Sequence, residues 1–232
     1  MFALAFAVLA FGTPGATLYD GTSDKTPQQS PWTWGLVGSG GNVTPPMGTG
    51  KVTLDTTADP SGQIGWLNVS PLAMNPASRP VVTFDLRMVS ETHFSFDRAG
   101  LSVIVIASDK KGIELSFWDD RVWVQNDNPI FTHGEEAFID TKAFGSGKAG
   151  LRRYALTFSG TFYRLSVDGQ QILSGLRRDY SAFTGFPDPY EIPNVLWVGD
   201  DTHSAQAKFE FSWFAVNIGA TMIGSGIKRD PH

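Results

Sequence analysis

Hydrophobic and polar residues alternate one by one over several stretches of this chain, which is the pattern of β-strands with one buried face. Between residues 81 and 88, alternate positions are apolar and are expected to point into a core: Val82, Phe84, Leu86 and Met88. The run 208–216 is expected to place four side chains on one face: Phe209, Phe211, Trp213 and Ala215. No stretch carries an apolar stripe at helical spacing for more than two turns, so the pattern predicts an all-β protein.

Residues 152–173 contain three such runs, joined at Ser159-Gly160 and at Asp168-Gly169. Asp-Gly between alternating runs favours a tight hairpin, because type I′ turns need residues that tolerate positive φ. Three strands within about 22 residues are typical of antiparallel sheets packed as a sandwich.

Residues 101–107 are almost continuously apolar, which predicts a central strand that is covered on both faces. The run 113–118 is expected to turn three side chains to the core: Ile113, Leu115 and Phe117. Glu114 and Trp118 would then share the opposite face, because neighbouring residues of a strand point to opposite sides of the sheet.

The 232 residues are 41% hydrophobic and 12% aromatic, which is enough to build a sizeable core in one domain. A net charge of −5, with no basic run longer than a pair, argues against nucleic acid as a partner. The chain has no cysteine, which excludes disulfides, thiolate metal sites and a cysteine nucleophile.

Residues 2–11 form an apolar run that is too short to span a bilayer but fits the hydrophobic region of a signal peptide. We expect a signal peptide over 1–16, although the basic residues that normally precede the apolar run are lacking. One sandwich domain would then cover 17–217, and a loosely ordered tail would cover 218–232. No second apolar span follows, so we expect a secreted protein without a transmembrane anchor.

Three segments resemble one fold family. Residues 163–173 (YRLSVDGQQIL) resemble a strand of concanavalin A-like and laminin-G-like jelly rolls that ends in Val-Asp-Gly, after which the chain returns at once. Residues 196–201 (LWVGDD) are similar to the penultimate strand of these domains, and 211–216 (FSWFAV) to their closing strand. The resemblance, which extends to exported bacterial proteins of this superfamily, implies an all-β, two-sheet antiparallel jelly-roll sandwich. Lectins, glycan hydrolases, lyases and adhesive modules share this fold, so it implies no single function.

Glucanases of this superfamily carry Glu-x-Asp-x-x-Glu or Glu-x-Asp-x-Glu on one strand. The nearest segment here, 114–120 (ELSFWDD), has Ser116 in place of the middle Asp and Trp118 in place of the second Glu. Retaining hydrolysis needs two carboxyl groups about 5 to 5.5 Å apart, whereas Glu114 and Asp119 fall on opposite faces of an unbroken strand. We therefore predict no catalytic residue and favour a protein that is not an enzyme.

Aromatic side chains on an open sheet face stack well against the apolar faces of sugar rings. Trp118 and Trp123 bracket the Asp119-Asp120 turn, and Glu114 and Arg121 would supply polar groups beside them. We expect these two tryptophans, Glu114 and Arg121 to form a ligand-binding surface. The alternative is that both tryptophans fill the core, since most of the 7 Trp and 17 Phe must be buried.

Asp200 and Asp201 follow a predicted strand, and Asp188 and Glu191 lie in the loop before it. Their oxygens would suit Ca²⁺, and the resemblance to laminin-G-like domains implies such a site at the sandwich rim. The alternative is that these acidic residues cap turns. The four histidines lack the spacing of a zinc site.

The sequence thus predicts a secreted module that binds an extracellular glycan or a surface protein through its concave sheet and rim loops, without catalysis. Two alternatives stay open: a glycan-cleaving hydrolase or lyase, and a structural subunit of an extracellular layer that forms homo-oligomers. The enzyme would need two acids, or a tyrosine and a histidine, that converge in one groove.

Overall fold

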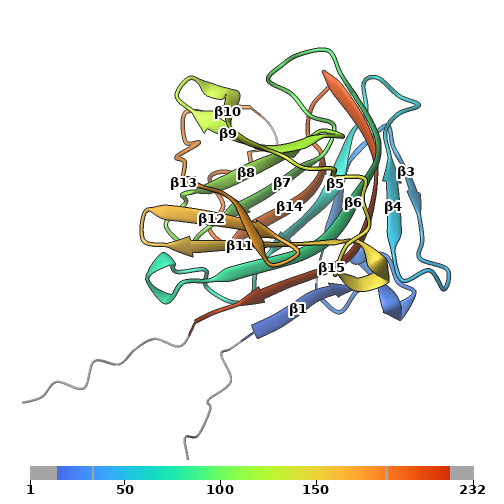
Figure 1. The fold of residues 1–232 in the computed structure, drawn as a ribbon, viewed down its shortest axis with the longest axis horizontal. Helices are drawn as coiled ribbons and strands as arrows, with labels where there is room; N and C mark the ends of the chain where they lie inside the picture. The colour runs from blue at the N-terminus through green and yellow to red at the C-terminus, as the bar shows by residue number, and fades with distance from the viewer. Residues whose placement is uncertain (1–14, 33, 186–187, 220–232) are drawn as a thin grey trace, which may run out of the picture.

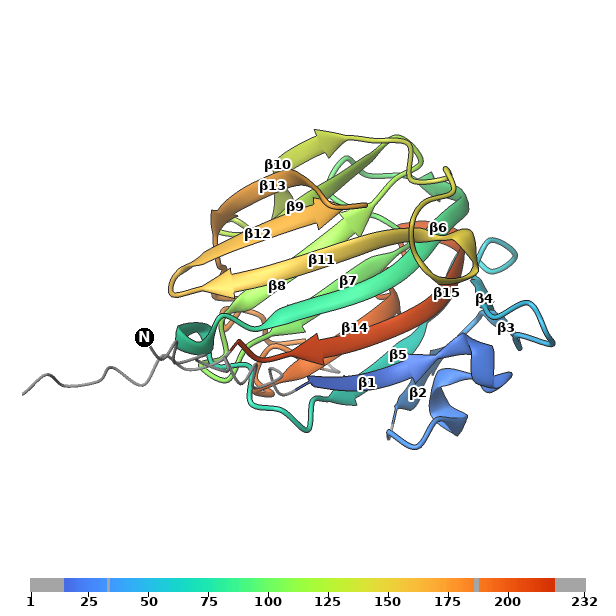
Figure 2. The same ribbon diagram turned by 60° about the horizontal axis from the view of Figure 1, so that its bottom comes forward.

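Two antiparallel sheets face each other in the computed structural model, which describes residues 15–32, 34–185 and 188–219 (Figure 1). In Figure 2 the strands of one sheet, from β13 to β1, lie side by side at the front, and β7, β14 and β5 of the other lie behind them. The predicted all-β, two-sheet jelly-roll sandwich is confirmed.

We call the two sheets A and B. In spatial order sheet A contains β13 (Gln170–Leu176), β12 (Phe162–Val167), β11 (Arg152–Ser159), β6 (Val81–His93), β15 (Ala205–Asn217), β4 (Val52–Asp55) and β3 (Asn42–Thr44), and β1 (Gly15–Asp20) also pairs with β15. Sheet B contains β10 (Ile130–Phe138), β9 (Arg121–Asp127), β8 (Gly112–Phe117), β7 (Ser102–Ile106), β14 (Val195–Asp200), β5 (Gln63–Val69) and β2 (Gly35–Ser39). Short 3₁₀ turns are η1 (Gly21–Ser23), η2 (Pro27–Gln29), η3 (Pro76–Ser78) and η4 (Lys148–Gly150).

The predicted hairpin at 168–169 joins β12 to β13. Asp168 has a φ of 49° and Gly169 a φ of 87°, so both central residues adopt the positive φ that this turn requires. The preceding hairpin also turns through a positive φ, 57° at Gly160. The three strands predicted within 152–173 are therefore β11, β12 and β13.

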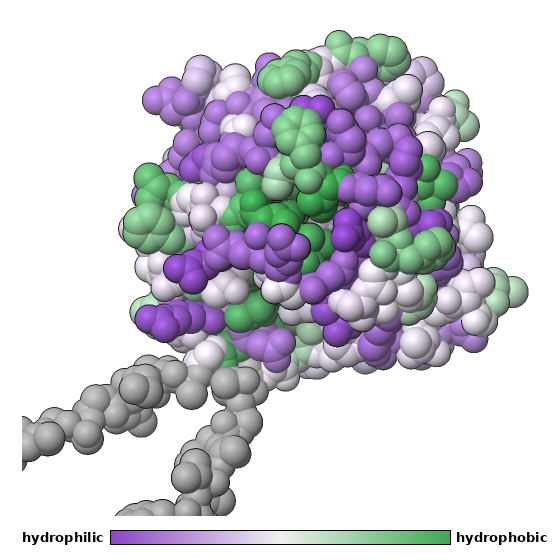
Figure 3. All heavy atoms as spheres, viewed as in Figure 1, coloured by the Kyte–Doolittle hydropathy of each residue, from purple (hydrophilic) through white to green (hydrophobic). Residues whose placement is uncertain are grey.

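The core lies between the sheets and follows the predicted alternation. On β8 the core-facing side chains are those predicted: Ile113, Leu115 and Phe117. The central strand predicted over 101–107 is β7, which lies between β8 and β14, and all five of its residues are buried. Figure 3 shows the molecule from the side of Figure 1, with hydrophobic residues in the middle of this face and hydrophilic residues around them. The hydrophobic residues lie in the region between β9 and β12 of Figure 1.

The prediction for the last strand was wrong at Trp213 and at Ala215, whereas Val216 packs in the core. The register of β15 against β6 shifts between Phe211 and Trp213, so the alternation slips by one residue at this irregularity. Phe214 takes the core position instead. Trp213 is only partly buried, and the Nζ atom of Lys148 lies 3.7 Å from its ring centroid.

A second apolar cluster covers the outer face of sheet B, the face turned away from the core. Its buried members are Ile104, Ile106, Tyr180, Tyr190, Val195 and Trp197. Tyr180 and Tyr190 come from the long connection between β13 and β14, which therefore folds back over this face. Residues of this connection form one wall of a cavity over the sheet face.

The predicted signal peptide falls largely outside the described residues, which begin at Gly15. Gly15 and Ala16 pair with Asn217 and Val216 of β15. Most of the predicted tail also lies outside the described residues, so these boundaries stay predictions. Among the residues that the structure describes, no helix is long and apolar enough to cross a membrane.

Candidate ligand-binding site

A cavity of about 390 Å³ lies on the outer face of sheet B, beneath the connection between β13 and β14. Its lining residues from sheet B include Leu67, Ile104, Glu114, Gln125, Phe131 and Trp197, and those from the surrounding loops include Arg98, Phe183, Tyr190 and Asp201. This mixture of apolar walls with a few polar groups, at this volume, is typical of small-molecule sites. We call it the sheet B pocket.

Trp197 is the tryptophan that sheet B contributes to this pocket. Leu196 and Val198 of β14 face the core, so alternation turns Trp197 to the outer face. Its indole ring lies across Gly65 of β5, where an added Cβ atom would stand 2.4 Å from Cζ2 of the indole. The missing side chain at Gly65 therefore lets the ring lie on the sheet.

Two carboxyl groups meet in the sheet B pocket. Glu114 of β8 is 2% exposed, and its Oε2 atom accepts a hydrogen bond of 2.5 Å from the hydroxyl of Tyr190. The hydroxyl of Ser102 lies 3.4 Å from Oε1 of Glu114 and 3.2 Å from Oδ1 of Asp201. Glu114 of β8 and Asp201, which follows β14, are remote in sequence but share the hydroxyl of Ser102 on β7. We call these two carboxyl groups the acid pair.

Burial governs the charge of this pair. It raises the pKa of Glu114 well above the usual carboxyl value, and the nearby charge of Asp201 raises it further. Burial also raises the pKa of Asp201 to about 6, although hydrogen bonds such as that from Ser102 oppose the shift. The pair therefore retains a proton at pH values where exposed carboxyl groups are ionised.

Tyr180 fixes the backbone beneath the acid pair. Its hydroxyl accepts a hydrogen bond of 3.1 Å from the backbone N–H of Glu114 and donates one of 2.8 Å to the carbonyl of Gln125. The ring centroids of Tyr180 and Tyr190 are 5.0 Å apart. The two tyrosines thus hold Glu114 from two directions.

Two polar atoms of the pocket residues have no hydrogen-bond partner among the described residues: Oε1 of Gln125 and Nε1 of Trp197. Both side chains are more than nine-tenths buried, at 3% and 6% exposed. Buried polar atoms nearly always have partners. The residues that line the sheet B pocket therefore carry one unpaired acceptor and one unpaired donor.

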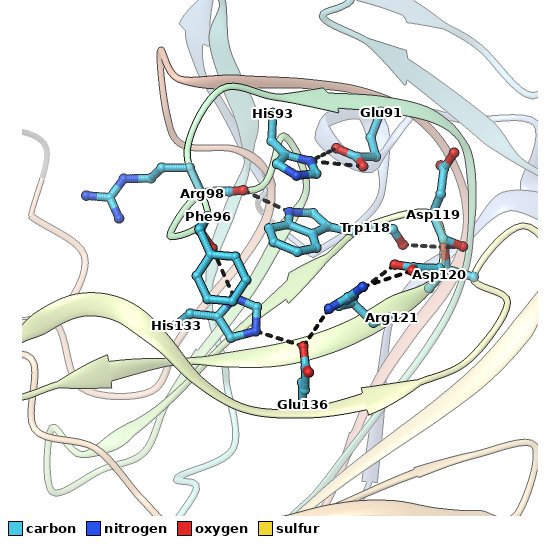
Figure 4. A network of polar contacts seen from close by, with 11 residues as sticks. Glu91, His93, Phe96, Arg98, Trp118, Asp119, Asp120, Arg121, His133 and Glu136 are labelled. Carbon is cyan, nitrogen blue, oxygen red and sulfur yellow. Dashed lines mark hydrogen bonds and ion pairs between the residues drawn. The ribbon is translucent and has the colours of Figure 1, made fainter.

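Of the four residues predicted to bind a ligand, only Glu114 lines the sheet B pocket. The other three lie in a neighbouring cluster: Trp118 packs against Trp123, and the guanidinium of Arg121 lies 5.1 Å from the ring centroid of Trp118. Figure 4 shows Trp118 and Arg121 of this cluster. His93 stacks on Trp118 with ring centroids 4.0 Å apart, and His133 stacks on Trp123 at the same distance.

The two tryptophans of this cluster are 4% and 0% exposed, because residues of the β6–β7 loop and of β10 close over them. The indole N–H of Trp118 donates to the carbonyl of Arg98, and Arg121 pairs with Asp120 and Glu136 (Figure 4). The predicted sugar platform stays a prediction, but a ring covered on a face by histidine offers that face to no sugar.

Asp200 and Asp201 turn to opposite sides of sheet B, as neighbouring residues at a strand end do. The carboxyl group of Asp200 is buried against Thr56, 2.6 Å from its hydroxyl, whereas Asp201 joins Glu114 in the pocket. Among the described residues, no group of three or more acidic or histidine side chains could hold a metal ion. The predicted calcium site stays a prediction and has no such ligand set in the described part of the chain.

Sequence reasoning did not single out two residues that line the pocket, Trp197 and Tyr190. Trp197 could have been found, since alternation in 195–199 places it opposite Leu196 and Val198 and facing the side-chain gap at Gly65. Tyr190 gave no such signal, because it lies in a connection without periodicity.

No family model matches the chain, and no curated protein matches it in sequence. Solved structures do. The carbohydrate esterase vb_24B_21 of the Shiga toxin-encoding bacteriophage phi24B superposes with a TM-score of 0.54 at 15% identity, over 89% of this chain and 100% of its own. A Bacillus subtilis protein of unknown function with a galectin-like fold gives 0.50 at 13% identity, over 88% and 98%. Shewanella oneidensis MR-1 SO2946, also of unknown function, gives 0.52 at 12% identity, over 94% and 91%. At these identities the similarity establishes the fold alone.

Proposed function

We propose that this protein binds a carbohydrate in the sheet B pocket and does not cleave it. The observation that carries the proposal is the pair of unsatisfied polar atoms, Oε1 of Gln125 and Nε1 of Trp197, beside an apolar ring surface. Sugars combine an apolar ring face with hydroxyl groups that both donate and accept hydrogen bonds, so one sugar can satisfy both atoms.

The fold supports the same class of ligand. Two of the similar structures bear names with a carbohydrate connection, an esterase of carbohydrates and a galectin-like fold. The apolar segment 2–11 favours export, so we propose that the glycan is met outside the cytoplasm.

A second candidate function, glycan cleavage, is favoured by the acid pair. Glu114 and Asp201 both reach the hydroxyl of Ser102, so they converge in one groove as a glycosidase requires. Glu114, which keeps its proton, would be the general acid, and Asp201 would be the nucleophile or base. This arrangement supplies the two acids that the segment 114–120 alone lacks.

The test of the binding proposal is a glycan array followed by titration of the glycans that bind. Trp197→Phe keeps an apolar ring but removes the free N–H, so we expect affinity to fall about fivefold to tenfold. Trp213→Phe on sheet A is the matched control and should bind as the wild type does.

The same glycans decide between binding and cleavage when new reducing ends are followed over time. Binding without product supports the proposal. Product release that is lost in both Glu114→Gln and Asp201→Asn would put the second candidate first. If no glycan binds, the proposal falls, and the structural-subunit alternative takes its place.

A further inference from the structure

The carboxyl groups of Glu114 and Asp201 face the sheet B pocket, whereas that of Asp200 is turned away against Thr56. Two basic residues also line the pocket, Arg98 and His203. The basic side chains already have other partners. Arg98 donates from Nη1 to the carbonyls of Asp97 and Phe131, at 2.7 and 2.6 Å, and its guanidinium points away from Trp118 in Figure 4. The Nδ1 atom of His203 lies 2.7 Å from the carbonyl of Ser61.

Neither carboxyl group of the acid pair forms a salt bridge with a cationic side chain among the described residues, but the charge of Arg98 lowers the pKa of both, so one cation serves two carboxyl groups. One cation balances at most one carboxylate, so the two buried carboxyl groups keep a proton between them until a second positive charge arrives. A ligand that brings a positive charge can take the place of that proton, whereas a neutral hydroxyl group cannot.

Resting on the proposed function, we propose that the pocket selects sugars with a free primary amine, whose ammonium group binds between Glu114 and Asp201. Binding releases the shared proton to solvent, so the complex holds two carboxylates and one ammonium group. Charge-assisted hydrogen bonds of this kind are roughly twice as strong as neutral ones.

The unsatisfied atoms nearby fit the rest of such a sugar. Oε1 of Gln125 is an acceptor for a hydroxyl or ammonium hydrogen, and Nε1 of Trp197 donates to a ring or hydroxyl oxygen. N-acetylation would remove the positive charge and leave the carboxyl pair with its proton. The pocket is therefore expected to reject the acetylated form of the same sugar.

The pH dependence follows from the groups that surround the pair. These are Tyr180 and Tyr190 from the β13–β14 connection, Arg98 from the β6–β7 loop, Asp200 at the end of β14, and His203 beyond it. The pKa values of both tyrosines are raised well above the usual value by burial and by the charge of Glu114, so neither ionises near neutrality. The proton that competes with the ammonium group is that of the acid pair. Affinity should rise from pH 5 to pH 7 as that proton becomes easier to displace.

Isothermal titration of the full chain tests this with three probes: the β-1,4-linked dimer of glucosamine, its N-acetylated form, and the corresponding glucose dimer. We expect the amine to bind on the order of tenfold more tightly than either neutral dimer at pH 7. Titration in two buffers of different ionisation enthalpy should reveal proton release. The preference should vanish in Glu114→Gln and persist in Glu191→Gln, because Glu191 is not among the pocket-lining residues and pairs with Lys110.

The outcomes separate this inference from the function on which it rests. Equal binding of all three dimers, or no proton release, would overturn amine selection and leave carbohydrate binding intact. Absence of binding by any of a full panel of glycans would overturn both. If Glu114→Gln does not fold, amine selection is still tested on the wild-type chain, by the relative affinities of the three dimers and by the pH dependence of amine binding.

Discussion

Asp200 shows how burial at a single residue ties stability to pH. Its carboxyl group is fully buried at the end of β14, where Oδ2 lies 2.6 Å from the hydroxyl of Thr56 and Oδ1 accepts from the backbone N–H of Thr202 at 3.2 Å. Burial raises its pKa to about 8, although these two hydrogen bonds oppose the shift. The folded state therefore binds this proton more tightly than the unfolded chain does, and stability is lost as pH rises from the usual carboxyl pKa of 3.8 to about 8.

We therefore expect Asp200→Asn to remove that loss. The amide can donate to the hydroxyl of Thr56, which donates in turn to the carbonyl of Ala207, and its oxygen can still accept from Thr202. The variant should gain on the order of 2 kcal/mol over the wild type at pH 9 and little at pH 5. Urea unfolding at both pH values measures this. A gain independent of pH would show that Asp200 is not the titrating group.

At the scale of the element, the contact between β5 and β14 supports the pocket floor. An added Cβ atom on Gly65 would lie 2.4 Å from the indole of Trp197 and 2.8 Å from the Cα atom of Gly199. Gly65→Ala should therefore lift the ring, cost about 1 to 3 kcal/mol in unfolding free energy, and weaken glycan binding. Chemical denaturation and titration measure the two effects.

Gly35→Ala on the edge strand β2 is the matched control, because the nearest atom to an added Cβ there is 3.8 Å away. It should change stability by less than about 0.5 kcal/mol and leave binding unchanged. Equal effects of the two substitutions would mean that Trp197 does not depend on the gap at Gly65.

The strands show what local sequence could predict. Alternation gave the inward residues of β8 correctly, and Asp168-Gly169 gave the hairpin, because both signals act within a few residues. Alternation failed at Trp213 on β15. One irregularity in the pairing of β15 with β6 turns every later side chain of the strand to the opposite face of the sheet. Nothing in the local sequence marks where that irregularity falls.

At the scale of the whole molecule, the acid pair is the part that the sequence could not predict. The pattern of its own strand predicts Glu114 as a ligand-binding residue. Its partner Asp201 lies 87 positions away, and the sequence predicts it as a ligand of a calcium ion at the sandwich rim. Tyr190, which holds Glu114, belongs to a connection without periodicity. These three residues meet only because sheet B places β7, β8 and β14 side by side and the connection folds over them.

The fold offers two places on sheet B where a sugar could bind, the predicted surface at Trp118 and the pocket at Trp197. Both lie on the outer face of sheet B, but His93 and His133 stack on the tryptophans of the first, whereas the second encloses a cavity. We therefore place the proposed sugar in the cavity, which combines apolar walls with a few polar groups, and not on rings that histidines cover.

The measurement that tests this account most directly is a titration of the ¹⁵N-labelled chain with its best-binding glycan, followed through the indole N–H resonances of its 7 tryptophans. Trp197→Phe assigns the resonance of Trp197 by its disappearance. The account predicts that this resonance moves most and saturates with the glycan, while that of Trp213 stays in place. Saturable shifts at Trp118 or Trp123 with none at Trp197 would contradict it, and would place the sugar on the neighbouring cluster instead.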